Sequence, residues 1–166
     1  MTSMLERSAR IVDGTDNAPI GLKVTVDATP VEEVAPGIGV IESFSNVVVF
    51  NTDDGLTLFD VSHGMAAKSV VASLRSWSND RVNTAVYTHG HTDHVGGAGA
   101  FNADATRRAD RPIQYVAHEA VVDRFDRYKL TNGYNGYINM RQFRLPGPMF
   151  PSDFVYPDTT FRSETT

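Results

Sequence analysis

The period of the hydrophobic residues changes along this chain, and that change constrains the fold more than any other feature. Residues 31–62 contain short runs of branched and aromatic side chains, and turn formers separate the runs at Pro36 and Gly37 and again at Asp53, Asp54 and Gly55. This pattern is typical of an antiparallel meander with a hairpin at the second turn. Within residues 65–77 the spacing becomes three and four, which predicts a helix with one apolar face formed by Ala67, Val70, Val71, Leu74 and Trp77.

Two further strands and one further helix follow. The nearly continuous apolar run VNTAVYT, residues 82–88, predicts a strand that is covered on both faces and leads directly into His89. IQYVA, residues 113–117, repeats the strand pattern, and a second helical stripe comprises Val121, Val122, Phe125 and Tyr128. Strands, helix, strand, loop, strand and helix in this order predict an α/β domain in which helices pack on a sheet.

The two ends of the chain are less regular. Residues 1–30 have weak periodicity and several turn formers, so we expect a loosely attached lead-in with one short strand at LKVTV, residues 22–26. Beyond Leu130 the sequence is irregular but aromatic, and we expect it to pack on the rest of the molecule.

Composition excludes several classes of protein. The chain has 166 residues, which suits one hydrophobic core, and no cysteine, which excludes disulfides, thiolate zinc sites and cysteine nucleophiles. The net charge of -5 argues against nucleic acid as a partner. The one basic cluster, Arg107, Arg108 and Arg111, is interleaved with Asp104 and Asp110, and we interpret it as a solvated loop. No apolar stretch is long enough for a membrane span or a signal peptide, so we expect a cytoplasmic protein. The expected partner is a small-molecule substrate.

Four potential metal ligands lie within the stretch YTHGHTDHVGG, residues 87–97. They are His89, His91, Asp93 and His94. Imidazole nitrogens and a carboxylate are the ligands that zinc takes in the absence of thiolates. Four ligands within six residues are too crowded for one ion, so two half-sites are the more natural interpretation, and paired ions about 3.5 to 4 Å apart are a known hydrolytic device. The alternative, a solvent-facing histidine cluster, is disfavoured because chance gives this pattern only about a few times in ten thousand.

The motif THGHTDHVGG resembles the metal-binding signature of the metallo-β-lactamase superfamily, and SNVVVFNTDDGLTLFDVS resembles the paired strands that precede it. The resemblance implies an αββα sandwich, of which residues 31–166 would be an incomplete domain, the N-terminal half to two-thirds. It also implies two Zn²⁺ ions, with His89 and His91 on the first and Asp93 and His94 on the second. Asp93 would in addition be a catalytic residue, and Asp60, at the end of a predicted strand, would orient a metal ligand from behind.

The sequence departs from the family pattern in its last third. In a complete superfamily domain the second half supplies a further ligand to each metal, but no histidine follows His118 here. One hypothesis is therefore a zinc hydrolase, represented by its N-terminal portion, in which a metal-bound hydroxide attacks an ester-like, lactone, thioester, sulfate ester or β-lactam bond. The other is a truncated, catalytically incompetent fragment that binds metal weakly, associates with itself, or needs a missing C-terminal half.

Several other residues have two interpretations. His63 lines the metal cleft or, in the better-supported alternative, caps a helix or faces solvent. His118 is a substitute ligand or a residue behind the ligands, whereas a histidine that ends a strand is usually satisfied by backbone or water. The segment after residue 117 faintly resembles alkyl sulfatase-like members of the superfamily. In it, the side chains of Asn132, Tyr134, Tyr137 and Asn139 either contact a substrate or belong to a packed loop.

Overall fold

The computed structural model describes residues 3–16 and 28–164. In this part of the chain, seven strands form one mixed sheet in which their spatial order is their order in the sequence. The strands are β1 (Glu32–Ala35), β2 (Ile38–Ile41), β3 (Val47–Thr52), β4 (Gly55–Phe59), β5 (Val82–Tyr87), β6 (Gln114–His118) and β7 (Thr159–Phe161). The helices are α1 (Met4–Val12), α2 (Ala67–Trp77), α3 (Thr92–Val95), α4 (Ala98–Arg108), α5 (Ala120–Leu130) and α6 (Asn132–Phe143).

The sheet changes from antiparallel to parallel at its centre. Strands β1 to β4 form the predicted meander, with antiparallel pairing throughout and a hairpin that pairs Thr52 with Gly55. Strands β4 to β7 are parallel. Because parallel strands point the same way, the carboxyl ends of β4, β5 and β6 lie at one edge of the sheet, where a ligand site is expected in an open α/β sheet.

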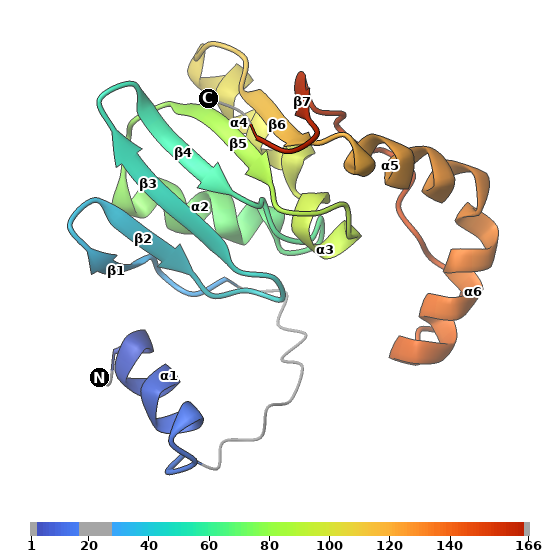
Figure 1. Cartoon of the computed structure of the whole chain (residues 1–166), viewed down its shortest axis with the longest axis horizontal. Coiled ribbons are helices and arrows are strands. Elements are labelled where there is room, and N and C mark those ends of the chain that lie inside the picture. The colour runs from blue at the N-terminus through green and yellow to red at the C-terminus, as the bar shows by residue number, and fades with distance from the viewer. Residues whose placement is uncertain (1–2, 17–27, 165–166) are drawn as a thin grey trace.

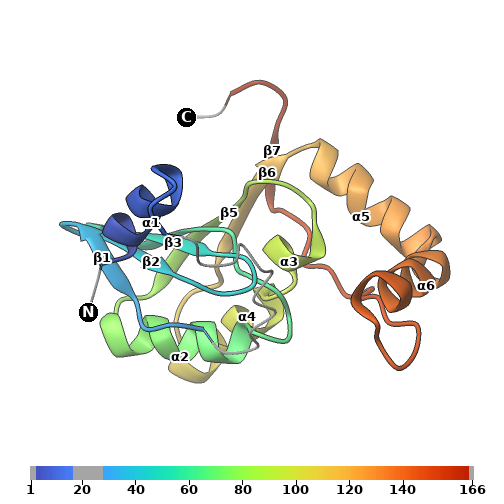
Figure 2. The ribbon, with the colours of Figure 1, turned by 90° about the horizontal axis from the view of Figure 1, so that it is seen from below.

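The hydrophobic core lies between one face of the sheet and the helices α2 and α4, which cover that face together (Figure 2). Leu58 and Ala85 on the central strands are fully buried, as are Val70 and Leu74 on α2. The α/β architecture and the helix at residues 67–77 are therefore confirmed. Among the described residues, no helix combines the length and the apolar character that crossing a bilayer requires.

The opposite face of the sheet is only partly covered, and this corrects the prediction for β5. Val82, Ala85 and Tyr87 on this strand are buried, whereas the other three side chains are only partly buried. On the neighbouring strand β4, Phe59 is 37% exposed, and its ring lies 5.5 Å from that of Phe50. The apolar run of β5 reflects its central place in the sheet rather than burial on both sides.

We expected Arg107 and Arg108 in a loop, but they lie in the last turn of α4. An ion pair with α2 holds this helix in place. Asp104 is 2% exposed, and its carboxylate accepts a hydrogen bond from Arg75 Nε on α2 at 2.7 Å and another from Arg107. A buried carboxylate needs such partners, and here they fasten α4 to α2.

Helices α1 and α6 were not predicted either. Helix α1 lies in the expected lead-in and begins with a capping box, in which Ser3 Oγ accepts from the Glu6 amide and Glu6 accepts from the Ser3 amide. The expected strand at residues 22–26 lies outside the described residues. Helix α6 occupies residues that we expected to be irregular, and together with α5 it projects from the edge of the sheet (Figure 1). The following segment packs back on α5, as predicted for the aromatic residues, through Phe150 and Phe154.

Candidate metal centre

The sequence motif lies at the carboxyl edge of the parallel strands, where the loop after β4 meets the loop after β5. Backbone hydrogen bonds join the two loops: the Val61 amide donates to His94 O at 2.8 Å, and the Gly97 amide donates to Ser62 O at 3.0 Å. Gly97 also lies so close to the other loop that a Cβ at this position would be 1.9 Å from Val61 O. Only glycine permits this approach, so the glycines of the motif serve its seating in the fold.

Asp60 is the residue that connects the two loops most directly. Its carboxylate is 5% exposed and accepts hydrogen bonds from the Thr88 amide at 2.8 Å and the Thr88 hydroxyl at 2.7 Å. Oδ2 also lies 2.7 Å from His94 Nδ1. The backbone of Asp60 is left-handed, with a φ of 62°, a conformation that residues other than glycine adopt at a cost when a site requires it.

His94 is held on several sides. Besides its contact with Asp60, both of its ring nitrogens lie within hydrogen-bond distance of the hydroxyl of buried Ser45, at 3.1 and 2.9 Å. Burial disfavours the charged ring, but the hydrogen bond that the ring donates to Asp60 and the negative charges of Asp60 and Asp93 outweigh it, so the pKa of His94 is raised.

His89 and His91 are held mainly by each other. His89 Nε2 lies 2.9 Å from His91 Nδ1, and His89 Nδ1 lies 3.1 Å from the Thr88 hydroxyl. His91 is exposed, and the ring of His89 lies between those of His91 and His94, with centroid distances of 4.6 and 4.0 Å. Burial lowers the pKa of His89, and the neighbouring charges of His94 and His91 lower it further.

Asp93 completes the group that the sequence predicted. Its Oδ2 lies 3.4 Å from His94 Nε2, so the four side chains of the motif gather in one place. The nitrogen and carboxylate donors fit zinc in kind. In the part of the chain that the structure describes, however, no three such side chains surround a common point at which an ion would be held. The described chain therefore offers donors in pairs, and their assignment as metal ligands stays a prediction.

The two remaining histidines have different surroundings. His118 contacts backbone on both sides of its ring, because Nε2 lies 2.6 Å from Arg162 O and Nδ1 accepts from the Ala120 amide at 3.1 Å. These contacts agree with the backbone-satisfied alternative, and a role behind the metal ligands stays a prediction. His63 accepts from the Met65 amide at 3.1 Å and also lines a cleft, so both of its interpretations describe part of its surroundings.

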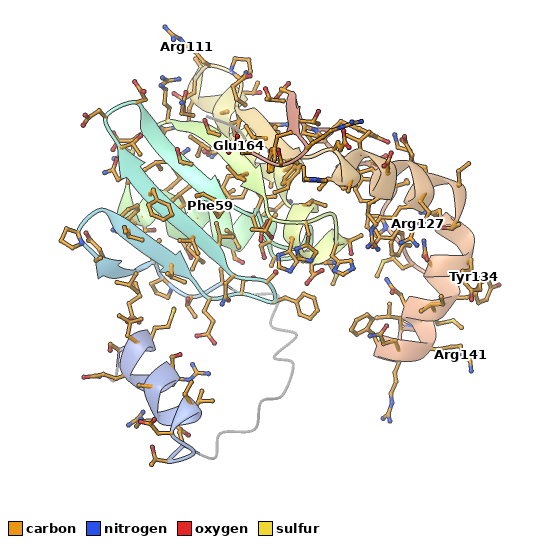
Figure 3. All side chains as sticks on the ribbon, in the orientation of Figure 1. Phe59, Arg111, Arg127, Tyr134, Arg141 and Glu164 are labelled. Carbon is orange, nitrogen blue, oxygen red and sulfur yellow. The ribbon has the colours of Figure 1, made fainter. Side chains whose placement is uncertain are left out.

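A cleft of about 830 Å³ opens beside the motif, between α3 and the helices α5 and α6. His91 and Asp93 line it on one side, and Asn139 lines it on the other. Tyr134 and Tyr137 are not among the residues that line it, and they are 71% and 59% exposed. Figure 3 shows Tyr134 on the outer side of α6. Asn132 is a packing residue, because its amide donates to Phe150 O at 3.1 Å.

Sequence reasoning missed several residues of the site. Thr88 directly follows β5 and precedes His89, so its position at a strand end was an available signal. Ser45 lies 49 positions from His94, and no local pattern marks it. Arg124 contacts the motif through Gly90, where a Cβ would lie 2.8 Å from Arg124 Cγ. Its place on the predicted helix of residues 121–128 was visible, but its distance from the motif was not.

The family model of the metallo-beta-lactamase superfamily matches residues 40–154, which is more than half of the chain. This match includes Asp60 and the complete motif. No curated protein gives a significant match to the sequence.

Solved structures of similar fold include the following three. A metallo-beta-lactamase with a HARLDQ motif from Cronobacter sakazakii is 14% identical, with a TM-score of 0.61, over 85% of this chain and 49% of its own. The metallo-beta-lactamase GOB-18 from Elizabethkingia meningoseptica is 21% identical, with a TM-score of 0.58, over 89% of this chain and 48% of its own. The inverting sec-alkylsulfatase Pisa1 from Pseudomonas sp. is 20% identical, with a TM-score of 0.56, over 68% of this chain and 18% of its own. The chain thus spans less than half the length of each.

Proposed function

The chain belongs to the metallo-beta-lactamase superfamily, and on this premise we propose that it provides the metal loop of a zinc-dependent hydrolase. The observation that carries the proposal is the gathering of His89, His91, Asp93 and His94 at the carboxyl edge of the parallel strands, with buried Asp60 behind His94. The proposed assignment places His89 and His91 on one Zn²⁺ and Asp93 and His94 on another. Bound zinc supplies Lewis acidity, which polarises a scissile bond and lowers the pKa of water.

Asp60 orients a ligand in this proposal. Its carboxylate accepts from the Thr88 amide and hydroxyl, which fixes the direction in which Oδ2 meets His94 Nδ1. A carboxylate at Nδ1 favours the tautomer with its proton on that nitrogen, and this tautomer leaves Nε2 free to bind a metal. The contact of the Asp60 carboxylate with His94 Nδ1 supports this role.

Asp93 faces the cleft and is the carboxylate placed to act on the substrate. Its side chain is 30% exposed and lines the cleft together with His91. A carboxylate at this point can accept a proton from water or hold water in position for attack. The bonds open to such a site are those of esters, lactones, thioesters, sulfate esters and β-lactams, and the substrate is a small molecule.

Hydrolysis assays on a panel of chromogenic substrates test the proposal. The panel contains nitrophenyl esters of acetate and sulfate and a chromogenic β-lactam, and each is measured with metal-free and zinc-loaded chain. The proposal expects hydrolysis of at least one substrate that requires zinc and is lost in Asp93→Asn. Activity that persists without metal, or that is equal in Asp93→Asn, contradicts it. The matched control is Asp123→Asn, an exposed carboxylate of α5 that lies outside the cleft.

A second candidate is a metal-binding unit that acts only after its open sheet face is covered. The half-exposed side chains of β3, β4 and β5, with Phe59 37% exposed, support self-association through this face. Sedimentation velocity across a range of concentrations tests it. A concentration-dependent dimer that is weakened by Phe59→Lys supports the candidate, and a monomer at all concentrations contradicts it.

A further inference from the structure

The cleft beside the motif carries two arginines for which the described part of the chain provides no acidic partner. Arg124 and Arg127 both line it, and neither forms an ion pair with any described residue. The arginine–carboxylate ion pairs of the described chain all lie outside this cleft, as does the pair of Arg75 with buried Asp104. The chain has a net charge of -5, and yet Asp93 is the only acidic side chain among the described residues that line this cleft.

Tyr128 holds both guanidinium groups in place. Its ring is buried and packs against Phe150, with ring centroids 4.8 Å apart. The guanidinium carbons of Arg124 and Arg127 lie 5.5 and 5.6 Å from the centre of this ring, and Arg124 Nη1 donates to the Tyr128 hydroxyl at 3.3 Å. Cation–π contacts of this kind restrict the arginines before any ligand arrives.

Arg124 is also fixed against the motif itself. Its stem fills the space above Gly90, where a Cβ would lie 2.8 Å from Arg124 Cγ and 3.1 Å from Arg124 Cβ. Gly90 lies between His89 and His91, so Arg124 reaches the cleft directly beside two predicted metal ligands. In Figure 3, Arg127 lies on the inner side of α5, whereas Arg141 lies on the outer side of α6.

Apolar side chains form another part of the cleft wall, and several of them are partly exposed. Met65 and Met149 are 54% and 53% exposed, and Phe143 is 38% exposed. Phe44 contributes from the sheet side, and its ring lies 6.4 Å from that of Phe143 and 5.9 Å from that of His63. The volume of about 830 Å³ falls within the range of roughly 300 to 1,000 Å³ that is usual for small-molecule sites.

We propose that Arg124 and Arg127 bind the anionic group of an amphiphilic substrate, whose aliphatic part lies against Phe44, Met65, Phe143 and Met149. Guanidinium groups prefer sulfonate, carboxylate and phosphate oxygens, and methionine side chains adapt to flexible chains. The proposal rests on the proposed function in one respect, because it calls the ligand a substrate. Anion recognition itself involves residues outside the metal motif.

Calorimetric titration of the metal-free chain with octanesulfonate tests the anion site, because this probe has the expected head and chain and cannot be hydrolysed. We expect Arg124→Met to weaken binding about tenfold, since one charge-assisted hydrogen bond is lost while the stem that packs on Gly90 is kept. Arg127→Met should weaken it less, and Arg124→Lys should restore part of the affinity. Arg141→Met, an exposed arginine outside the cleft, is the matched control and should bind as the unaltered chain does.

Two more probes separate head from chain. Methanesulfonate, which has no chain, and octyltrimethylammonium, which has the opposite charge, should both bind more weakly than octanesulfonate. Equal binding of the cation, or equal binding of octanesulfonate by Arg124→Met and the unaltered chain, overturns the inference. Thermal unfolding of each variant confirms that it is folded.

Zinc titration of the same proteins separates this inference from the proposed function. Zinc binding without octanesulfonate binding overturns the anion site alone. Octanesulfonate binding that depends on Arg124, in a chain that binds no zinc, supports the anion site and overturns the proposed function.

Discussion

The two halves of the histidine motif differ in how firmly the fold holds them. His94 contacts buried Asp60 at 2.7 Å and buried Ser45 at 2.9 Å, and its backbone carbonyl bonds to the loop after β4. We call His94, together with its partners Asp60 and Ser45, the anchored half. His89 and His91, the open half, contact chiefly each other, and His91 is exposed at the cleft.

This difference in how the histidines are held indicates that one short motif has two roles, one in stabilising the fold and one at the cleft. The anchored half raises the pKa of its histidine because a buried carboxylate lies behind the ring. In the open half, burial and neighbouring histidine charges lower the pKa of His89. Side chains whose polar groups the fold already satisfies contribute to stability, whereas side chains exposed at the cleft are free to contact a ligand.

The largest effect is expected at Gly97, just after α3, where the motif packs against the loop after β4. In Gly97→Ala, the new Cβ would lie 1.9 Å from Val61 O, and a backbone atom there has no free rotation with which to withdraw. We expect a loss of about 3 kcal/mol in the free energy of unfolding, measured by urea denaturation. The matched control is Gly99→Ala in the same segment, where nothing lies within 4 Å and no loss is expected. Equal stability of the two variants would contradict the close seating of the motif.

Removal of the charge behind His94 comes next. Asp60→Asn keeps the shape of the side chain and tolerates the left-handed backbone, but it turns one acceptor oxygen into a donor that faces donors. We expect a loss of about 2 kcal/mol in unfolding free energy. An unchanged urea midpoint would show that Asp60 does not hold the anchored half.

The pH dependence of the metal-free chain should distinguish the halves by sign. His94 has a raised pKa when folded, so its stabilisation is fully present below the ordinary value of 6.5 and is lost as the pH rises through the folded pKa. His89 has a lowered pKa, so its contribution is lost as the pH falls below 6.5. Nuclear magnetic resonance titration should give His94 the higher pKa, and Asp60→Asn should lower it. A higher pKa for His89 than for His94 would reverse the comparison.

The smallest effect is expected in the open half. His91→Ala removes an exposed ring that contacts only its neighbour, so the free energy of unfolding should change by less than about 0.5 kcal/mol. His94→Ala is the matched comparison and should cost about 1 to 2 kcal/mol because it removes one hydrogen-bond partner of buried Asp60 and the ring that contacts buried Ser45. Similar losses in the two variants would remove the distinction between the halves.

The central fold could be predicted from sequence because its signals are local. The meander and α2 follow from the spacing of apolar residues, and the position of Asp60 follows from its place at a strand end. Helix α4 was missed because its anchor, the pair of Arg75 with Asp104, joins residues 29 positions apart. Helix α6 contains glycines and asparagines that resemble a loop pattern, and its place depends on packing against distant segments.

The site was predictable to a similar depth. The motif itself was visible as a cluster of ligand types, but Ser45 and Arg124 enter it only through the fold. Both contacts join segments more than 30 positions apart, Ser45 with His94 and Arg124 with Gly90. The cleft likewise depends on the angle at which α5 and α6 leave the sheet, which no local pattern encodes (Figure 1).

The zinc affinity of the chain is the most direct test of its proposed role. Isothermal titration of the metal-free chain should show zinc binding that is weakened at least about tenfold in His94→Ala and in His89→Ala, since each removes a proposed ligand. His118→Ala is the matched control, because the described contacts of that ring are with backbone and a neighbouring phenylalanine. Zinc binding that is retained in both motif variants, or lost only in His118→Ala, would contradict the assignment of the metal to residues 89–94.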